Sequence, residues 1–185
     1  MDKGAWFSDA VTYAYIHGLF NGTGENTFSP YDTMTRAMFI TVIGRMTGAD
    51  VSKYQSNIPS SDADMDPYYA PYIAWTTEHG ITEGMGVDIF LWNEPLNREQ
   101  MATLIVHLFD AFGYTYPEEN VTGSPRNLDS ISGYAAEPVL KLWECGIIKG
   151  DNEGRFNPKS NATRAECATF LMRIDEHLVN IGAKK

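Results

Sequence analysis

The sequence has few cysteines and few positive charges. Among its 185 residues are two cysteines, four histidines, and 14 lysines and arginines against 24 aspartates and glutamates, so the net charge at pH 7 is −10. These cysteines and histidines form no zinc site of ordinary spacing, and the run from Asp62 to Asp66 lacks the glycine and the final glutamate of a calcium loop. A chain this acidic is poorly suited to neutralising many phosphates or to docking on anionic lipid. We therefore expect no nucleic acid, no membrane insertion, no metal and no cofactor.

Long apolar runs are also absent. No window approaches the roughly 18 consecutive apolar residues of a membrane-spanning helix. Residues 1–6 lack the apolar core of a signal peptide, so the chain is either cytosolic or a piece of a longer exported protein. Its 43% of hydrophobic and 12% of aromatic residues are enough for a sizeable core, which excludes a disordered chain.

What the chain does have is one segment that occurs three times. In each copy a glycine is followed by a second glycine after four residues, a phenylalanine after six more and an arginine after a further eight. The three sets are Gly18, Gly22, Phe28 and Arg36; Gly80, Gly84, Phe90 and Arg98; and Gly146, Gly150, Phe156 and Arg164. Identical spacing at four positions indicates an internal repeat. We place the repeats at residues 1–47, 67–112 and 134–180, with linkers at 48–66 and 113–133, and expect them to form one domain together.

Each copy is predicted to contain a helix, a loop and a second helix. The first helix is an amphipathic stretch that ends at the first glycine, where a helix C-terminus favours positive φ. A second left-handed residue is expected two positions before each phenylalanine, at Asn26, Asp88 and Gly154. The loop is therefore specified by backbone geometry as well as by its pattern.

The second helix of each copy carries its own start signal. A threonine or asparagine precedes each arginine and can serve as the N-cap. A capping box is completed by Glu166 in the third copy and by Gln100 in the second, whereas Met38 cannot complete one in the first. A pair of helices of this size cannot bury its apolar stripe alone. We therefore expect an all-α fold in which three helix-loop-helix repeats pack as a compact pseudo-threefold assembly, in preference to an open solenoid.

The repeated arginine stands where a cation is locally unfavourable. Arg36, Arg98 and Arg164 each occupy the first position of a helix, where the helix dipole disfavours a cation by a few tenths to about 1 kcal/mol. Free first-turn N–H groups, the dipole and a guanidinium together would make a site for a carboxylate or a phosphate. The alternative is that each arginine bonds loop carbonyls or an acidic residue of the adjoining repeat and acts as an internal staple.

Other residues of the repeats have mainly structural interpretations. The phenylalanines are expected to plug the core, and the aromatic residues that begin the repeats, Trp6, Tyr68 and Tyr134, to pack while offering their polar edges to a groove. Cys167 is expected to be a small buried hydrophobe, and a disulfide with Cys145 stays open. No constellation of serine, histidine or cysteine indicates a nucleophile, so we expect no enzyme.

These residues also carry a family resemblance. The third copy, with GIIKG at 146–150, FNP at 156–158 and TRAE at 163–166, is similar to a surface-layer homology (SLH) repeat, and the chain resembles a tandem of three over roughly residues 5–178. The resemblance implies an all-helical pseudo-trimer that anchors exported proteins to the bacterial cell wall, on the extracellular side. Its ligand would be an anionic secondary cell-wall polysaccharide, often one that bears ketal-linked pyruvate.

The resemblance also implies site residues, because in this family the motif arginine contacts the sugar in grooves between neighbouring repeats. The ligand-binding candidates are Arg36, Arg98 and Arg164, with Gly22, Gly84 and Gly150 as weaker backbone candidates. The second copy departs from the pattern, since Glu99 adds an acid beside its arginine and Trp92 replaces a proline. We expect its site to be the weakest, unless Trp92 stacks on a sugar.

Two functions stay open at this point. The first is a non-catalytic, monomeric module that binds an anionic wall polysaccharide. The second is a structural or protein-interaction module in which the arginines are staples. Arginines facing an open cleft favour the first function, whereas arginines turned inward and saturated by neighbours favour the second.

Overall fold

The structure is a computed structural model that describes residues 4–54, 66–82, 90–118 and 121–183. In these ranges the regular secondary structure is helical, and extended pairing is confined to isolated β-bridges. The elements are α1 (Ser8–Ile16), α2 (Arg36–Met46), η1 (Ser52–Tyr54), α3 (Ala70–Glu78), α4 (Arg98–Phe112), η2 (Leu128–Ser130), α5 (Gly133–Glu144) and α6 (Arg164–Asn180). The predicted all-α fold is confirmed. Among the described helices, none has the length and apolar character needed to cross a bilayer.

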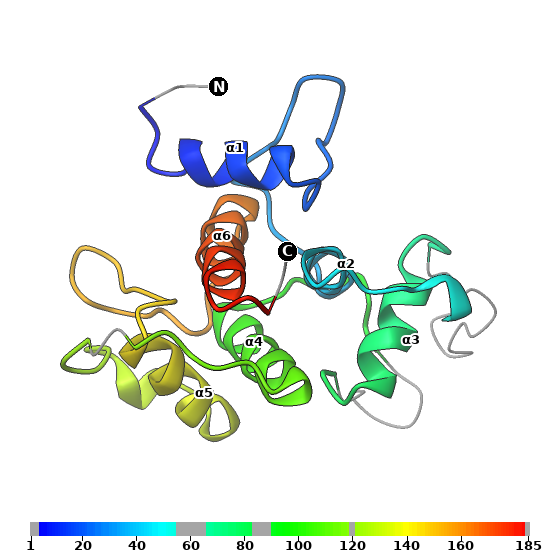
Figure 1. Ribbon diagram of the computed structural model, residues 1–185. Helices are drawn as coiled ribbons and strands as arrows, with labels where there is room; N and C mark the ends of the chain where they lie inside the picture. The colour runs from blue at the N-terminus through cyan, green and yellow to red at the C-terminus, as the bar shows by residue number, and fades with distance from the viewer. Residues whose placement is uncertain (1–3, 55–65, 83–89, 119–120, 184–185) are drawn as a thin grey trace.

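The six α-helices form an inner and an outer set. The second helices of the repeats, α2, α4 and α6, lie at the centre, and the first helices, α1, α3 and α5, lie around them (Figure 1). Each inner helix packs against the outer helix of the next repeat, since the main contacts join α2 with α3, α4 with α5 and α6 with α1. The last pair closes the ring, and there the hydroxyl of Tyr13 donates to the buried carboxylate of Asp175 at 2.8 Å. The repeats are therefore interlocked.

Three short extended segments join the inner helices at their N-terminal ends. The backbone N–H of Met34 donates to the carbonyl of Ala162 (2.9 Å), that of Ala162 to Leu96 (2.8 Å), and that of Leu96 to Met34 (2.9 Å). This closed cycle requires three repeats around one axis. The compact pseudo-threefold assembly is therefore confirmed, and the open solenoid is excluded.

The inner helices begin as predicted. Thr35, Asn97 and Thr163 are the N-caps, and each side chain accepts a hydrogen bond from the backbone N–H three residues further on. Capping boxes are complete with Gln100 and with Glu166. Because the cap fixes the start of the helix, the arginine that follows it takes the same position in every repeat.

The loops confirm one backbone prediction and correct another. Positive φ is found at the glycines that end the outer helices, Gly18, Gly80 and Gly146. It is also found at Gly154 (φ +73°) but not at Asn26, while Asp88 lies outside the described residues. In the first repeat the N–H of Thr27 donates to the carbonyl of Gly24 at 3.4 Å. A four-residue turn of this kind can form with negative φ at both central positions, so Asn26 needs no left-handed conformation.

A left-handed residue follows each phenylalanine instead. These residues are Ser29 (φ +50°), Leu91 (φ +57°) and Asn157 (φ +54°). Serine and leucine seldom adopt this conformation, so the packing around the turn imposes it. The turn recurs in all three repeats and adjoins the phenylalanine carbonyl that the arginine of the preceding repeat contacts.

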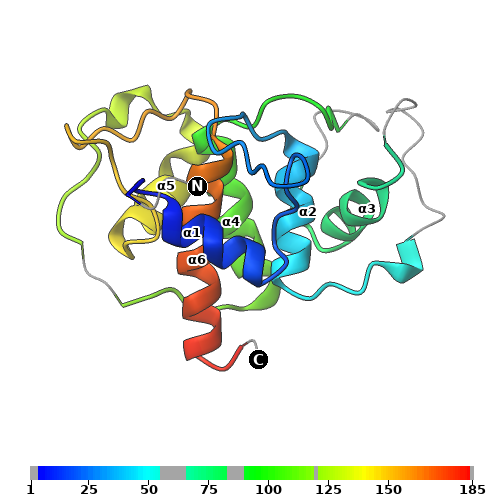
Figure 2. The same ribbon diagram turned by 90° about the horizontal axis from the view of Figure 1, so that it is seen from above.

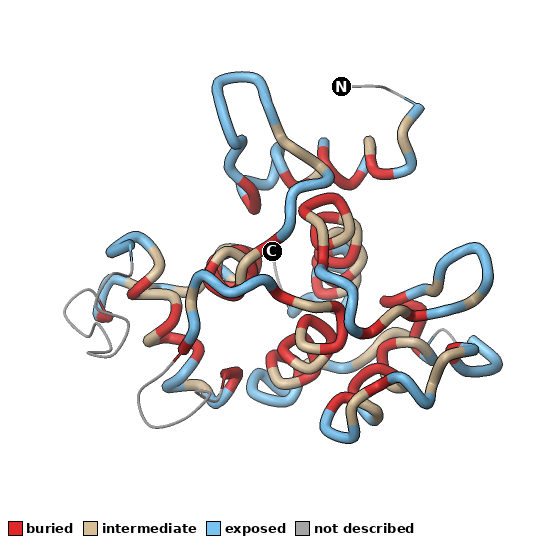
Figure 3. Tube along the Cα trace, turned by 180° about the vertical axis from the view of Figure 1, so that it is seen from behind, coloured by how far each residue is buried: buried red, intermediate tan, exposed pale blue. Residues whose placement is uncertain are grey.

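Burial distinguishes the inner from the outer helices. In α2 nine of eleven residues are buried, compared with three of nine in α1. Figure 3 shows the buried residues concentrated on the inner helices, with exposed loops around them. Phe90 and Phe156 are buried, as expected of core plugs, whereas Phe28 is half-buried. The core therefore follows the axis of the ring.

The two cysteines are not bridged, which answers the question left open by the sequence. Both are free and buried. The sulfur of Cys167 lies 3.7 Å from that of Met101. Burial raises the pKa of the Cys167 thiol, so it stays neutral and behaves as the buried hydrophobe that was predicted.

Candidate functional site

Each repeated arginine reaches from its own repeat into the loop of the next. The three residues are buried, with 6–8% of their surface exposed. The Nε–H donates to a phenylalanine carbonyl, and the guanidinium lies over the ring of that phenylalanine. The pairs, with the Nε–O and guanidinium–ring distances, are Arg36 with Phe90 (3.1 and 4.8 Å), Arg98 with Phe156 (2.8 and 4.9 Å) and Arg164 with Phe28 (2.8 and 4.6 Å). These hydrogen bonds and cation–π contacts join the repeats in a cycle.

The first-turn backbone amides are not available to a ligand. In α4 the N–H groups of Arg98 and Glu99 donate to the carbonyls of Ser160 (3.0 Å) and Pro158 (3.1 Å), and α2 and α6 begin in the same way. The cap side chain takes the next amide. The expectation that free N–H groups complete an anion site is therefore wrong, because the segment before the next inner helix occupies them. An anion would have to be held by side-chain cations.

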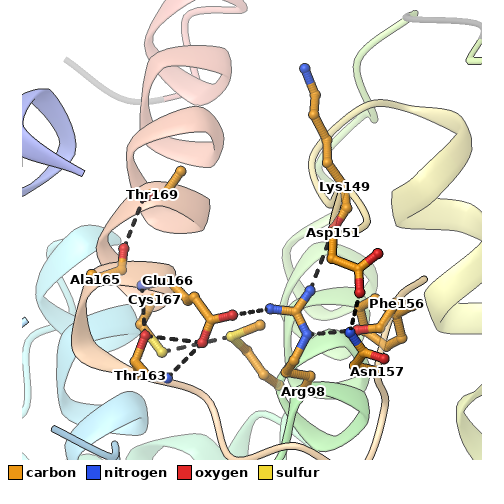
Figure 4. Close-up of polar contacts among 11 residues, drawn as sticks. Arg98, Lys149, Asp151, Phe156, Asn157, Thr163, Ala165, Glu166, Cys167 and Thr169 are labelled. Carbon is orange, nitrogen blue, oxygen red and sulfur yellow. Dashed lines mark hydrogen bonds and ion pairs between the residues drawn. The ribbon is translucent and has the colours of Figure 1, made fainter. Parts of the chain in front are cut away.

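The guanidinium of Arg98 is held between α6 and the third-repeat loop (Figure 4). Nη1 donates to Oε1 of Glu166 at 2.5 Å, and Nη2 donates to the carbonyl of Lys149 at 3.4 Å. The other carboxylate oxygen of Glu166 accepts from the N–H (2.9 Å) and the hydroxyl (3.0 Å) of Thr163. The capping box of the third repeat therefore also fixes the arginine of the second.

The other two arginines are held mainly by carbonyls. Nη2 of Arg164 donates to the carbonyl of Asn21 at 2.8 Å, at the repeat position that Lys149 occupies beside Arg98. Burial lowers the pKa of Arg36 and of Arg164, because desolvation disfavours the charged form. An arginine nevertheless keeps its charge in a protein. All three guanidinium groups therefore combine a structural role with a positive charge.

Glu99 does not face Arg98, contrary to the sequence-based expectation. Its buried carboxylate accepts from the N–H (3.0 Å) and hydroxyl (2.9 Å) of Ser132, the hydroxyl of Tyr134 (3.1 Å) and the ammonium of Lys159 (2.5 Å). Burial alone would raise the pKa of the Glu99 carboxyl, but the hydrogen bonds from Lys159, Ser132 and Tyr134 outweigh it and hold the pKa below its ordinary value. This carboxylate is therefore occupied elsewhere and does not oppose a ligand at Arg98.

The aromatic residues that begin the repeats are more exposed than expected. Trp6, Tyr68 and Tyr134 are 63%, 44% and 56% exposed. They lie at the starts of the outer helices, on the rim of the assembly. Trp92 is packed beside Tyr69, with ring centroids 5.9 Å apart, and belongs to the apolar cluster around Phe90. The expectation that Trp92 stacks on a sugar gains no support from this position.

A cavity of about 670 Å³ opens beside Arg98, between α6, the third-repeat loop and Trp6 of the first repeat. Its charged lining residues are Arg98, Lys149, Arg155 and Arg173, with Asp151 and Glu166. This is an excess of two positive charges in a chain whose net charge is −10. Sequence reasoning missed three of these cations and assigned Trp6 mainly to packing. A signal in the sequence was available. The loop cations Lys149 and Arg155 occur only in the third copy, and the corresponding residues of the first copy are Asn21 and Thr27.

The third-repeat loop is fixed around Asp151. This carboxylate accepts from the N–H groups of Glu153 (2.9 Å) and Arg155 (3.0 Å) and from the side-chain amide of Asn157 (2.9 Å). The hydrogen bonds from Arg155 and Asn157 lower the pKa of Asp151 to about 2. In contrast, the Lys149 ammonium makes no hydrogen bond or ion pair with the described residues, and Figure 4 shows it pointing away from Arg98. The loop thus presents a positive charge from a rigid backbone.

The glycine candidates are required by backbone packing. A Cβ on Gly150 would lie 2.8 Å from the carbonyl carbon of Gly154, and one on Gly22 would lie 2.8 Å from the carbonyl oxygen of Thr27. Gly150 also lines the cavity, whereas Gly84 lies outside the described residues. The structure thus brings Arg98 and Gly150 together at one cavity.

A smaller cavity of about 240 Å³ adjoins Arg36. Leu91, Glu94, Gln100 and Lys159 are among the residues that line it. The three arginine environments are not equivalent, because Arg98 is paired with Glu166 whereas Arg36 and Arg164 donate to backbone carbonyls.

The S-layer homology domain matches residues 1–38, 61–102 and 128–168, well over half of the chain. The chain belongs to the S-layer homology family. The three matched segments agree with the three tandem SLH repeats inferred from the spacing.

Proteins to which the chain is similar include S-layer proteins and enzymes. The chain is 31% identical to an endoglucanase of Bacillus sp. (strain KSM-635) over 95% of its length and 19% of the relative. It is 29% identical to an amylopullulanase of Thermoanaerobacterium thermosulfurigenes, over 97% of this chain and 10% of the relative. It is 26% identical to the S-layer protein sap of Bacillus anthracis, over 97% of this chain and 21% of the relative. The chain thus spans about a fifth or less of these relatives. Its SLH repeats make it a cell-wall anchoring module of the bacterial cell surface.

Proposed function

We propose that this SLH module binds an anionic, pyruvate-bearing secondary cell-wall polysaccharide in its inter-repeat grooves, chiefly in the cavity beside Arg98. The observation that carries the proposal is the concentration of Arg98, Lys149, Arg155 and Arg173 around a 670 Å³ cavity of an acidic chain. A carboxylate entering this cavity meets several donors at once, and charge-assisted hydrogen bonds are the strong ones.

The remaining site candidates are proposed as weaker positions. Arg36 adjoins the smaller cavity, whose cations are Arg36 and Lys159, and Arg164 is bonded to loop carbonyls, so each is proposed to meet a ligand with fewer cations than the Arg98 cavity offers. Gly22, Gly84 and Gly150 are proposed to shape the loops more than to contact the sugar. The site at Arg98, which was expected to be the weakest because of Glu99, is thus proposed as the main one.

We further propose that the module acts without catalysis, as a monomer, and as one part of a longer exported protein. The ring of three repeats is closed within one chain by the contact of α6 with α1, so a second copy is not required to complete it. The relatives that are named as enzymes or surface-layer proteins are much longer, and this chain matches between 10% and 21% of their length. The attached domain would therefore decide the activity of the whole protein.

The competing function, a purely structural or protein-interaction module, is favoured by the bonds from each arginine Nε to a phenylalanine carbonyl. Substituting an arginine cannot separate the two functions, because its loss would weaken the fold and any ligand contact at the same time. Lys149 separates them, since it lines the cavity and its ammonium has no partner among the described residues.

The test is a calorimetric titration of the parent chain, Lys149→Ala and Lys53→Ala with purified cell-wall polymer, before and after removal of its acidic groups. Lys53→Ala is the matched control because it removes an exposed lysine near η1, paired with Glu78, outside the cavity. Lys149→Ala lacks one charged hydrogen-bond donor, so its affinity for the polymer should be roughly tenfold or more weaker than that of the parent chain. Equal binding by all three proteins, or equal binding to the neutralised polymer, would contradict the proposal.

A further inference from the structure

A second cavity adjoins the one beside Arg98. It has a volume of about 280 Å³ and is lined by Pro117, the end of α5 and the last turns of α6. Lys149 and Arg173 line both cavities. Arg173 also spans from α6 to the third-repeat loop, where its Nη1 donates to the carbonyl of Ile147 at 2.9 Å. The two cavities therefore meet at one pair of cations.

One face of α6 runs along both cavities. Glu166, Thr169 and Phe170 line the first cavity, and Arg173 lies at the junction. Further along the same face, the second cavity is lined by Glu176, His177 and Asn180. These residues follow one another at intervals of three, one and three, which is the spacing of a single helix face. At 1.5 Å per residue the face is about 21 Å long, several times the width of a sugar ring.

Of the three inner helices, α6 of the third repeat extends furthest beyond the position of Arg173, so it can line both cavities. The repeat positions that correspond to Arg173 are Arg45 in α2 and His107 in α4. α2 ends one residue after Arg45 and α4 five residues after His107, whereas α6 continues for seven residues after Arg173. Figure 2 shows the last turns of α6 projecting beyond the other inner helices.

The second cavity differs from the first in what the end of α6 adds to it, because the charged residue beyond the shared pair Lys149 and Arg173 is the carboxylate of Glu176. Glu176 and Asn180 are exposed. The carboxylate of Glu176 can accept hydrogen bonds from sugar hydroxyls, and the side-chain amide of Asn180 can donate or accept them. His177 is held by a 2.6 Å contact between its Nε2 and the carbonyl of Thr115. The carboxylate of Glu176 would repel a second acidic group. The first cavity, with its excess of cations, would take the acidic sugar instead.

We propose that the two cavities form one extended groove, in which an acidic sugar occupies the first cavity and the neighbouring, neutral sugar of the same polymer occupies the second. This inference rests on the proposed function and adds a second subsite to it. Glu176 and Asn180 bind the neutral sugar by hydrogen bonds, and Lys149 and Arg173 flank the glycosidic link between the two rings.

The test compares two probes by calorimetry. One is a methyl hexoside bearing a single pyruvate ketal, and the other is a trisaccharide that ends in the same pyruvylated sugar followed by two neutral sugars. The parent chain should bind the trisaccharide at least about fivefold more tightly, as two added hydrogen bonds allow. Glu176→Ala/Asn180→Ala should lose that advantage and keep the affinity for the single sugar. Val179→Ala is the matched control, because Val179 is an exposed neighbour in the last turn of α6 and lines neither cavity.

The outcomes separate the subsite from the proposed function. If neither probe binds, the proposed function falls, and the subsite falls with it. If the single sugar binds and the trisaccharide is no tighter, the subsite is wrong while the proposed function stands. If the double variant keeps the trisaccharide advantage, the second cavity is not where the neutral sugar lies. Thermal denaturation of each variant verifies that these exposed substitutions leave the fold intact.

Discussion

At the scale of single residues, each repeated arginine lies between two repeats with its charge intact. In α6, Arg164 stacks on Phe28 and donates to the carbonyls of Phe28 and Asn21. Because the guanidinium is buried, removing it leaves two carbonyls without their donor in a place where water has little access. Arginine and lysine are not interchangeable at such a position, since lysine lacks the planar fork.

We therefore expect Arg164→Ala to lower the free energy of unfolding by about 2–4 kcal/mol. Urea denaturation followed by circular dichroism measures this difference. Arg155→Ala is the control, since Arg155 is exposed and pairs with Asp151 and Glu153 in its own loop; such pairs contribute about 0–1 kcal/mol. Equal losses in both variants would show that the contacts of Arg164 across the repeats are not stabilising.

Glu99 gives a prediction about pH. Its pKa in the folded chain lies below the ordinary value, so its carboxylate stabilises the fold fully above that ordinary value. The contribution is lost as the pH falls through the lower, folded-state pKa. The parent should therefore be more stable than Glu99→Gln at pH 7, and the difference should shrink between about pH 5 and pH 3. A difference that is constant over this range would contradict the network of Ser132, Tyr134 and Lys159 around the carboxylate.

At the scale of elements, the close approach of α2 and α3 depends on a glycine. A Cβ on Gly44 would lie 2.6 Å from Cδ1 of Tyr72 in α3. Alanine normally stabilises a helix relative to glycine by about 0.5–1 kcal/mol. At this position overpacking outweighs that gain, so the two helices must separate.

Gly44→Ala is expected to lower the free energy of unfolding by about 1–3 kcal/mol. Gly133→Ala is the matched control, because Gly133 begins α5 and a Cβ there has no neighbour within 4 Å. That variant should be neutral or slightly more stable. Denaturation curves of the two proteins measure both effects, and a stabilised Gly44→Ala would contradict the described packing of α2 on α3.

The local parts of the fold follow from the sequence, but the partners of each helix do not. The caps at Asn97 and Thr163 and the turn at Gly146 depend on residues a few positions apart, so the pattern predicts them. The pairing of α2 with α3 joins helices about 30 residues apart, and the bonds from the first-turn amides of α2 and α4 reach carbonyls about 60 residues away. The Arg98 cavity was missed for the same reason, since its cations come from α4, α6 and the third-repeat loop, and Trp6 comes from the other end of the chain.

At the scale of the whole molecule, the ring is closed where α1 meets α6. Tyr13 donates to the buried carboxylate of Asp175 across this seam, and the three central extended segments form one hydrogen-bonded cycle. In such an assembly the repeats support one another, so weakening one seam should lower the stability of all three repeats together.

Tyr13→Phe should lower the free energy of unfolding by about 1–3 kcal/mol, because it removes a hydrogen bond to a buried carboxylate. Hydrogen exchange should show reduced protection of the central helices in every repeat. Tyr15→Phe is the control, since Tyr15 is an exposed residue of the same helix. Loss of protection confined to α1 would indicate that the repeats unfold independently.

The central claim is that the groove beside Arg98 holds the acidic sugar, and NMR titration with the pyruvylated methyl hexoside tests it most directly. The Arg98 Nε–H, protected by its bond to Phe156, and the indole N–H of the exposed Trp6 report from opposite sides of the cavity. Both signals should shift with one shared dissociation constant, while the Nε–H of Arg164 changes little. Shifts at Arg164 with unchanged Arg98 and Trp6 signals would contradict the claim.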